Sequence, residues 1–130
     1  MPQELPKPTP AETEILNVLW DLGPSTVRQV HAVLNGQRPT GYTTVLKFMQ
    51  IMADKGLLSR VEGDARAHVY QPALERATTQ RQMVRDLVDR LFGGNPSQLV
   101  LQALEQLPAT PQALAEIRHL IEQREKGAVL

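Results

Sequence analysis

Residues 41–72 read GYTTVLKFMQIMADKGLLSRVEGDARAHVYQP, and this stretch decides the fold. Apolar residues recur at helical spacing over 42–55, and Gly56 follows as a C-terminal stop, so the stretch opens with a predicted helix. Residues 57–62 and 67–71 instead favour strands, and the GDAR segment between them favours a turn. The stretch therefore predicts a helix followed by a β-hairpin.

Two shorter helices are predicted upstream. Thr9 can cap the first helix, Glu12 can complete a capping box, and the Gly-Pro pair at 23–24 stops it. The second is capped by the serine or threonine at 25–26, and the Asn-Gly pair at 35–36 ends it. Three short helices followed by a hairpin form the plan of a winged helix-turn-helix, in which the third helix enters a DNA groove and the hairpin is the wing.

The part of the chain downstream of residue 72 predicts three more helices. The first spans 75–92 before a Gly-Gly pair, and the others begin at the Asn-Pro pair 95–96 and the Thr-Pro pair 110–111. Their Leu- and Val-rich faces would be exposed in a monomer, so we expect homodimerisation through them. The residues expected at this interface are Met83, Val84, Leu87, Leu91, Val100, Leu104, Ile117 and Leu120.

The predicted fold class is mainly α with a small β-hairpin: a winged helix-turn-helix followed by a helical dimerisation domain. Residues 1–8, rich in proline, are expected to form a disordered lead-in. Residues 9–72 are expected to form the DNA-binding domain and residues 73–130 the dimerisation domain.

The charge distribution indicates where an anionic partner would bind. The chain has 14 basic and 14 acidic residues, so its net charge is zero. Residues 26–72 nevertheless hold six basic and three acidic residues, a net charge of +3 (6 − 3), while residues 73–130 balance at seven of each. The predicted winged helix is therefore the segment suited to phosphate contacts.

On the third helix, the face opposite the apolar residues carries the main DNA-binding candidates. Thr43, Thr44 and Lys47 lie near its N-terminal end, which enters the major groove in helix-turn-helix docking. The alternative to DNA binding is a structural role, in which Thr43 only caps the helix and Lys47 is a solvated surface lysine. The further candidates are Tyr42 and Gln50 on the helix, Arg66 at the wing tip, Arg60 in the hairpin, and Arg28 and Arg38 upstream. A solvated position on the protein surface would explain these arginines about as well as DNA contact does.

Several segments are similar to those of the penicillinase-repressor family, the BlaI/MecI/CopY type. They are EILNVLW at 14–20, TVRQV at 26–30, GYTTV at 41–45, KGLL at 55–58, RAHVY at 66–70 and LVDRLFGG at 87–94. The resemblance implies a homodimeric repressor on a short inverted-repeat DNA operator, with a C-terminal helical dimerisation domain. Some family members are inactivated by a membrane sensor protease, which the resemblance therefore implies as a candidate partner.

Other function classes find little support in the sequence. The chain has no cysteine, so the paired cysteines of the family's copper-responsive branch are missing and thiolate copper sensing is excluded. The three histidines are isolated, and nucleophile motifs and glycine-rich phosphate loops are lacking, so we expect no metal, no cofactor and no enzymatic activity. Without an apolar run of membrane length, we expect a cytoplasmic protein with no membrane insertion. A winged-helix module that binds another protein is the alternative function.

Overall fold

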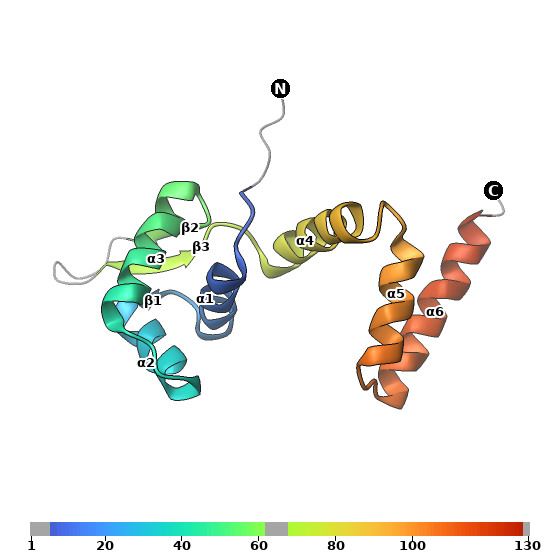
Figure 1. Cartoon of the computed structure of the whole chain (residues 1–130), viewed down its shortest axis with the longest axis horizontal. Helices are drawn as coiled ribbons and strands as arrows, with labels where there is room; N and C mark the ends of the chain where they lie inside the picture. The colour runs from blue at the N-terminus through green and yellow to red at the C-terminus, as the bar shows by residue number, and fades with distance from the viewer. Residues whose placement is uncertain (1–5, 62–67, 129–130) are drawn as a thin grey trace, which may run out of the picture. The chain divides into compact units, whose positions relative to one another are not determined.

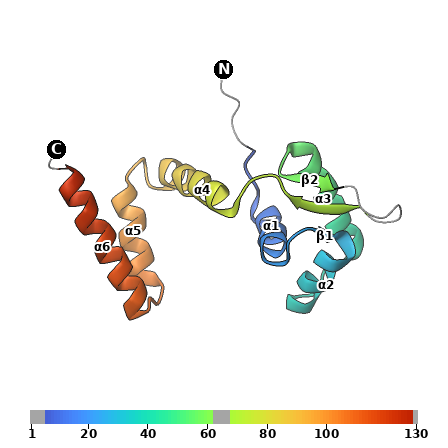
Figure 2. The same ribbon diagram turned by 180° about the vertical axis from the view of Figure 1, so that it is seen from behind.

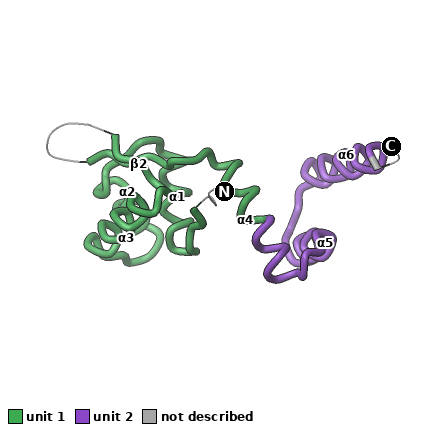
Figure 3. The backbone as a smooth tube through the Cα atoms, turned by 90° about the horizontal axis from the view of Figure 1, so that it is seen from above, with its two compact units in different colours: residues 1–84 green, residues 85–130 purple. Residues whose placement is uncertain are grey.

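A computed structural model describes residues 6–61 and 68–128, and its described elements are shown in Figure 1. The chain divides into two compact units, residues 1–84 and 85–130, coloured separately in Figure 3. The division falls inside one helix. The first unit contains the three helices and the hairpin strands that the sequence predicts for a winged helix.

Three helices form most of the first unit. They are α1 (Pro10–Leu22), α2 (Val27–Gln37) and α3 (Tyr42–Lys55). A capping box begins α1 at Thr9, as the sequence predicts. A second capping box begins α2 at Thr26, so the threonine, and not the serine before it, is the cap of α2. The α2 helix continues to Gln37, one residue beyond the predicted Asn-Gly stop, and α3 has its predicted bounds.

A small antiparallel sheet completes the unit. It has three strands in the order β1-β3-β2: β1 (Ser25–Thr26), β2 (Leu58–Val61) and β3 (Val69–Pro72). The hairpin of β2 and β3 confirms the prediction, with Arg60 opposite Tyr70. Strand β1 was not predicted, because two residues are too few to show an alternating pattern. It pairs with β3 through Ser25 opposite Tyr70, so the sheet ties the start of α2 to the hairpin.

One apolar core holds the three helices against the sheet. Its fully buried side chains include Leu19 of α1, Val30 of α2, Met49 and Met52 of α3, and Tyr70 of β3. The reverse view in Figure 2 shows the same three helices around the sheet. At the end of α3, Gly56 has φ of +85°, a left-handed conformation that favours glycine, and it turns the chain into β2. The core therefore fixes the orientation of α3.

The remaining helices are α4 (Arg76–Leu91), α5 (Pro96–Gln106) and α6 (Pro111–Ala128), close to their predicted positions. Helix α4 crosses the division between the units, since residues 76–84 belong to the first and 85–91 to the second. The structure describes every residue of α5, and none of them is buried. The chain is mainly helical with one small sheet, as predicted.

Candidate nucleic-acid interface

Helix α3 has one buried face and one exposed face. Val45, Met49 and Met52 are buried in the core. On the opposite face, the side chains of Thr43, Thr44, Lys47 and Gln50 are exposed. This separation follows from helical periodicity, because positions 43, 47 and 50 are one or two turns apart and lie on the same face. The core thus presents the predicted reading residues to solvent at the N-terminal half of the helix.

A shallow apolar hollow lies on one flank of this exposed face. It is lined by Thr43, Thr44, Lys47, Phe48 and Ile51. Phe48 is half-buried against the core, whereas Ile51 is 41% exposed. Phe48 is not among the site residues predicted from the sequence, although a three-residue step from Val45 marks it as a core-edge position. The flank offers two hydroxyls, one ammonium group and an apolar floor, which together suit a base edge and a thymine methyl group.

A second, basic hollow lies on the other flank of α3. Its lining residues are Thr26, Val27, Arg28, Tyr42, Leu46, Gln50, Arg60, His68 and Tyr70. Four of the predicted DNA-binding residues are therefore brought together from α2, α3 and β2. The Arg60 guanidinium lies over the ring of buried Tyr70, at 5.7 Å from the ring centroid. This cation–π contact holds the arginine beside α3.

The connection from α2 to α3 is fixed by His31. Its Nε2 lies 2.7 Å from the carbonyl oxygen of Thr40, and its ring meets that of Tyr42 edge-on with centroids 5.7 Å apart. The Thr40 amide also donates to Oδ1 of Asn35 at 3.0 Å. Tyr42 is 44% exposed at the edge of the basic hollow, although its ring contacts His31, so this DNA-binding candidate stays accessible to solvent.

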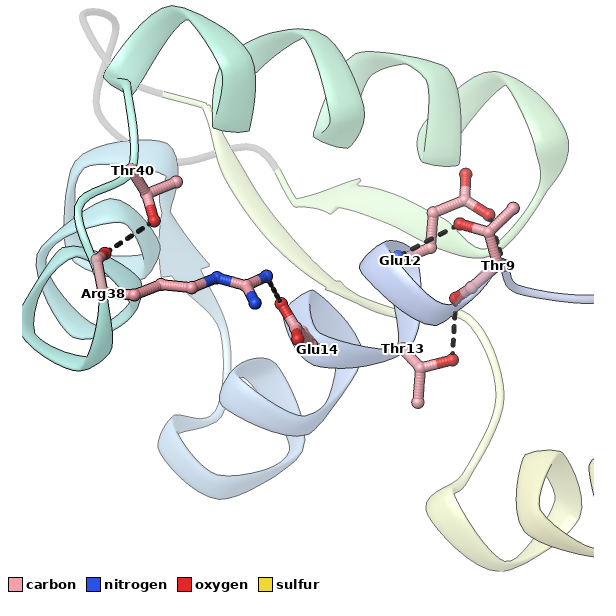
Figure 4. A network of polar contacts seen from close by, with 6 residues as sticks. All are labelled: Thr9, Glu12, Thr13, Glu14, Arg38 and Thr40. Carbon is pink, nitrogen blue, oxygen red and sulfur yellow. Dashed lines mark hydrogen bonds and ion pairs between the residues drawn. The ribbon is translucent and has the colours of Figure 1, made fainter.

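Two basic residues of the winged helix are engaged in ion pairs with α1. Arg38, a weak DNA candidate from the sequence, pairs with Glu14 at 2.6 Å, and Thr40 donates its hydroxyl proton to the Arg38 carbonyl oxygen (Figure 4). Lys55, which contributes to the positive charge of residues 26–72, pairs with the buried carboxylate of Glu12 at 2.8 Å. The positive charge of Lys55 therefore stabilises the fold.

The Glu12 carboxylate belongs to the capping box of α1. The Thr9 amide donates to its Oε1 at 2.9 Å, while the Glu12 amide donates to the Thr9 hydroxyl (Figure 4). Burial alone would raise the pKa of Glu12, but the hydrogen bonds from Lys55 and Thr9, together with the charge of Lys55, lower it below its usual value. The ionised carboxylate is thus the form that the folded state favours.

Arg66 at the predicted wing tip lies outside the described residues. Among the predicted dimerisation residues, Met83 and Ile117 are half-buried, and the rest are exposed. The exposed ones are Val84, Leu87, Leu91, Val100, Leu104 and Leu120.

Residues 6–61 and 68–128 contain neither a cluster of metal ligands nor a membrane-spanning helix. No group of three or more histidine, aspartate or glutamate side chains in this part of the chain is arranged to hold a metal ion. No helix of this part is both long enough and apolar enough to cross a bilayer.

Comparison with known proteins gives the chain's family. A family model described as the penicillinase repressor matches residues 8–123. The transcriptional regulator BlaI of Mycobacterium tuberculosis, in strains H37Rv and CDC 1551, is 33% identical over 113 residues, which cover 86% of this chain and 70% of the relative. The chain belongs to the penicillinase repressor family. As a member of this family it is a transcriptional regulator, and the family is not one of enzymes.

The solution structure of the DNA-binding domain of the repressor BlaI supports the fold. It superposes with a TM-score of 0.51 at 21% sequence identity, covering 58% of this chain and 92% of that domain. Helices α1, α2 and α3 and the hairpin therefore form a winged helix, as the order of elements predicts.

Proposed function

We propose that this penicillinase repressor relative is a homodimeric transcriptional repressor that binds an inverted-repeat DNA operator through the exposed face of α3. The observation that carries the proposal is the position of α3 between two hollows, one apolar and one basic. The similar domain of the repressor BlaI is a DNA-binding domain, which agrees with this proposal.

Each side of α3 has a distinct role in the proposed complex. Thr43, Thr44 and Lys47 read base edges in the major groove, because hydroxyl, methyl and ammonium groups match the donors, acceptors and methyl groups displayed there. Arg28 and Arg60, in the basic hollow, contact backbone phosphates and fix the register of the helix. Tyr42 and Gln50 line the same hollow and add neutral hydrogen-bonding groups at its edge.

The proposed homodimer rests on the apolar surface of the second unit. No residue of α5 is buried, although the helix carries Val100, Leu101 and Leu104 with exposed side chains. Leu120 and Ile121 of α6 are also exposed. A second copy of the chain would cover such faces, and a twofold dimer matches an inverted repeat. The membrane sensor protease stays a prediction from the family resemblance.

The test is operator binding by the Lys47→Ala protein. DNA duplexes enriched from a random pool by the wild-type protein serve as the operator, and binding is measured by gel-shift titration. We expect a loss of affinity of about tenfold or more, since one good base contact contributes about 1–3 kcal/mol. Lys126→Ala, which removes an exposed lysine of α6, is the control and should bind as the wild type does. Unchanged affinity of Lys47→Ala would refute the role of this lysine.

The alternative, a winged helix that binds protein, differs in its response to salt. Neutralisation of phosphates releases counterions, so DNA affinity must fall steeply with salt concentration. Arg28 and Arg60 in one hollow favour DNA, because a protein-binding surface does not require paired cations beside the recognition helix. A wild-type protein that enriches no duplex from the random pool would exclude the proposed function and favour the alternative.

A further inference from the structure

The segment that leaves the sheet is fastened to the rest of the winged helix at three points. The Ala73 amide donates to the Leu57 carbonyl oxygen at 2.9 Å, and the Leu74 carbonyl oxygen accepts from Nε1 of Trp20 at 3.2 Å. Arg76, the first residue of α4, then pairs with Asp21 of α1 at 2.6 Å. All of these residues lie within the first compact unit.

The side chain of Arg76 makes several contacts with α1 at once. Its guanidinium lies 5.5 Å from the centroid of the Trp20 ring, and its Nη2 also lies 3.5 Å from the Asn17 carbonyl oxygen. A planar guanidinium can stack on an indole and pair with a carboxylate at the same time, which an ammonium group does poorly. One turn later, Thr79 of α4 is buried, with 3% exposure. We call Trp20, Asp21, Leu74 and Arg76 the α4 clamp.

The proposed reading of DNA uses none of these residues. Trp20 and Asp21 lie on α1, Arg76 begins α4, and Leu74 lies in the connection between β3 and α4. The two hollows are instead formed by α2, α3 and the hairpin. What the clamp does fix is the starting direction of α4, a continuous helix that begins in the first unit and ends in the second. A helix transmits the orientation of its first turn along its length.

We propose that the α4 clamp is a positioning device that sets the operator spacing accepted by the dimer, with Arg76 as its principal residue. The inference rests on the proposed function. In a dimer held by its second units, the direction of each α4 determines the distance and rotation between the two α3 helices. Each added base pair moves the half-sites apart by about 3.4 Å and rotates them by about 35°. A rigid clamp therefore rejects altered spacings, whereas a loose one tolerates them.

The experiment compares Arg76→Ala with the wild type on a series of duplexes. Each duplex carries the half-site selected by the wild-type protein as an inverted repeat, at the selected spacing and with one, two or five base pairs inserted. Affinities are measured by fluorescence anisotropy of labelled DNA. For the wild type we expect one inserted base pair to weaken binding about tenfold, since poor geometry removes the gain from a second linked site.

For Arg76→Ala we expect that penalty to fall to about threefold or less, with the affinity for a single half-site unchanged. Arg81→Ala is the matched control, because it removes an exposed arginine from the same helix and changes the net charge equally. Asp21→Asn should act like Arg76→Ala, and Arg76→Lys should restore part of the spacing preference by keeping the ion pair.

Trp20, the chain's one tryptophan, gives a readout that does not involve DNA. Removal of the guanidinium above its ring should increase quenching of its fluorescence by acrylamide in Arg76→Ala and leave it unchanged in Arg81→Ala. If the wild type and Arg76→Ala show the same spacing penalty while both bind the selected half-site, the clamp inference is wrong and the proposed function stands. If the wild type binds no duplex selectively, the proposed function itself fails.

Discussion

Replacement of Glu12 by glutamine tests how the winged helix is held together. The Glu12 side chain is 3% exposed, and its Oε1 accepts hydrogen bonds from Lys55 at 2.8 Å and from the Thr9 amide at 2.9 Å. Glutamine has nearly the same shape and keeps one acceptor oxygen, so the change removes the charge and little else. The variant therefore isolates the contribution of this carboxylate's charge to the free energy of unfolding.

The expected loss follows from these two hydrogen bonds. A hydrogen bond to a charged group contributes about 1.5–3 kcal/mol, against about 0.5–1.5 for a neutral one, so the bond from the neutral Thr9 amide would weaken by about 1 kcal/mol. The bond from Lys55 keeps its charged donor and would weaken by less. The Lys55 side chain is 37% exposed, and solvent screening keeps its share at the lower end. We expect a total loss of about 1–2 kcal/mol in the free energy of unfolding. For a domain of this size that lowers Tm by about 4 °C or more.

The assay is urea unfolding of the full chain, followed by the fluorescence of Trp20 in α1. The folded-state pKa of Glu12 is lowered, so the ionised carboxylate stabilises the fold above the unfolded-state pKa of about 4.3, and this contribution is lost as the pH falls through the folded-state value. The difference between wild type and Glu12→Gln should be complete at pH 7 and shrink below about pH 4.

Glu14→Gln is the control for that experiment. Glu14 lies on the same helix and pairs with Arg38, but the two side chains are 47% and 67% exposed, so its loss should stay below about 1 kcal/mol. A Glu12→Gln protein as stable as the wild type at pH 7, or a difference that does not vary with pH, would refute the argument.

Three further predictions concern the interface, the dimer and the core. Arg60→Ala should reduce the slope of log Kd against log salt by about 1.8, because each protomer of the dimer loses one phosphate contact and each contact contributes about 0.9. An unchanged slope in anisotropy titrations would show that Arg60 does not contact the DNA backbone. Leu104→Glu should shift the dimer toward monomer in sedimentation, because its 38% exposed side chain lies on the apolar face of α5; an unaltered dimer would move the interface elsewhere. Met49→Ala should lower the free energy of unfolding by about 2–5 kcal/mol, since Met49 is fully buried; a loss under about 1 kcal/mol in urea would contradict its place in the core.

The parts of the fold that could be predicted from sequence are those with local signals. The capping box at Thr9, the left-handed Gly56 and the 3.6-residue period of α3 each depend on neighbouring residues, and each is confirmed. Strand β1 could not be predicted, because it exists only through pairing with β3, more than 40 residues later in the chain.

In the candidate site too, the features with a local sequence signal could be predicted and those that depend on distant contacts could not. Periodicity alone identified the exposed face of α3 that carries Thr43 and Lys47. It could not show that Arg28 and Arg60 share a hollow, nor that Arg38 and Lys55 are paired with carboxylates of α1. These outcomes depend on how α1, α2 and the hairpin pack, and a cation in the sequence shows no sign of which anion lies beside it. The α4 clamp joins residues about 55 positions apart and was missed for the same reason.

The central claim, that the exposed face of α3 reads an inverted repeat, is tested most directly by selection from random duplex DNA. The wild-type protein and a Thr43→Ala, Thr44→Ala double variant are carried through the same rounds, and the enriched sequences are compared. The wild type should enrich two inverted half-sites whose centres lie about one helical turn, or a multiple of it, apart. The double variant should lose preference at specific bases of each half-site. Enrichment of no repeat by the wild type, or of the same bases by both proteins, would contradict the account.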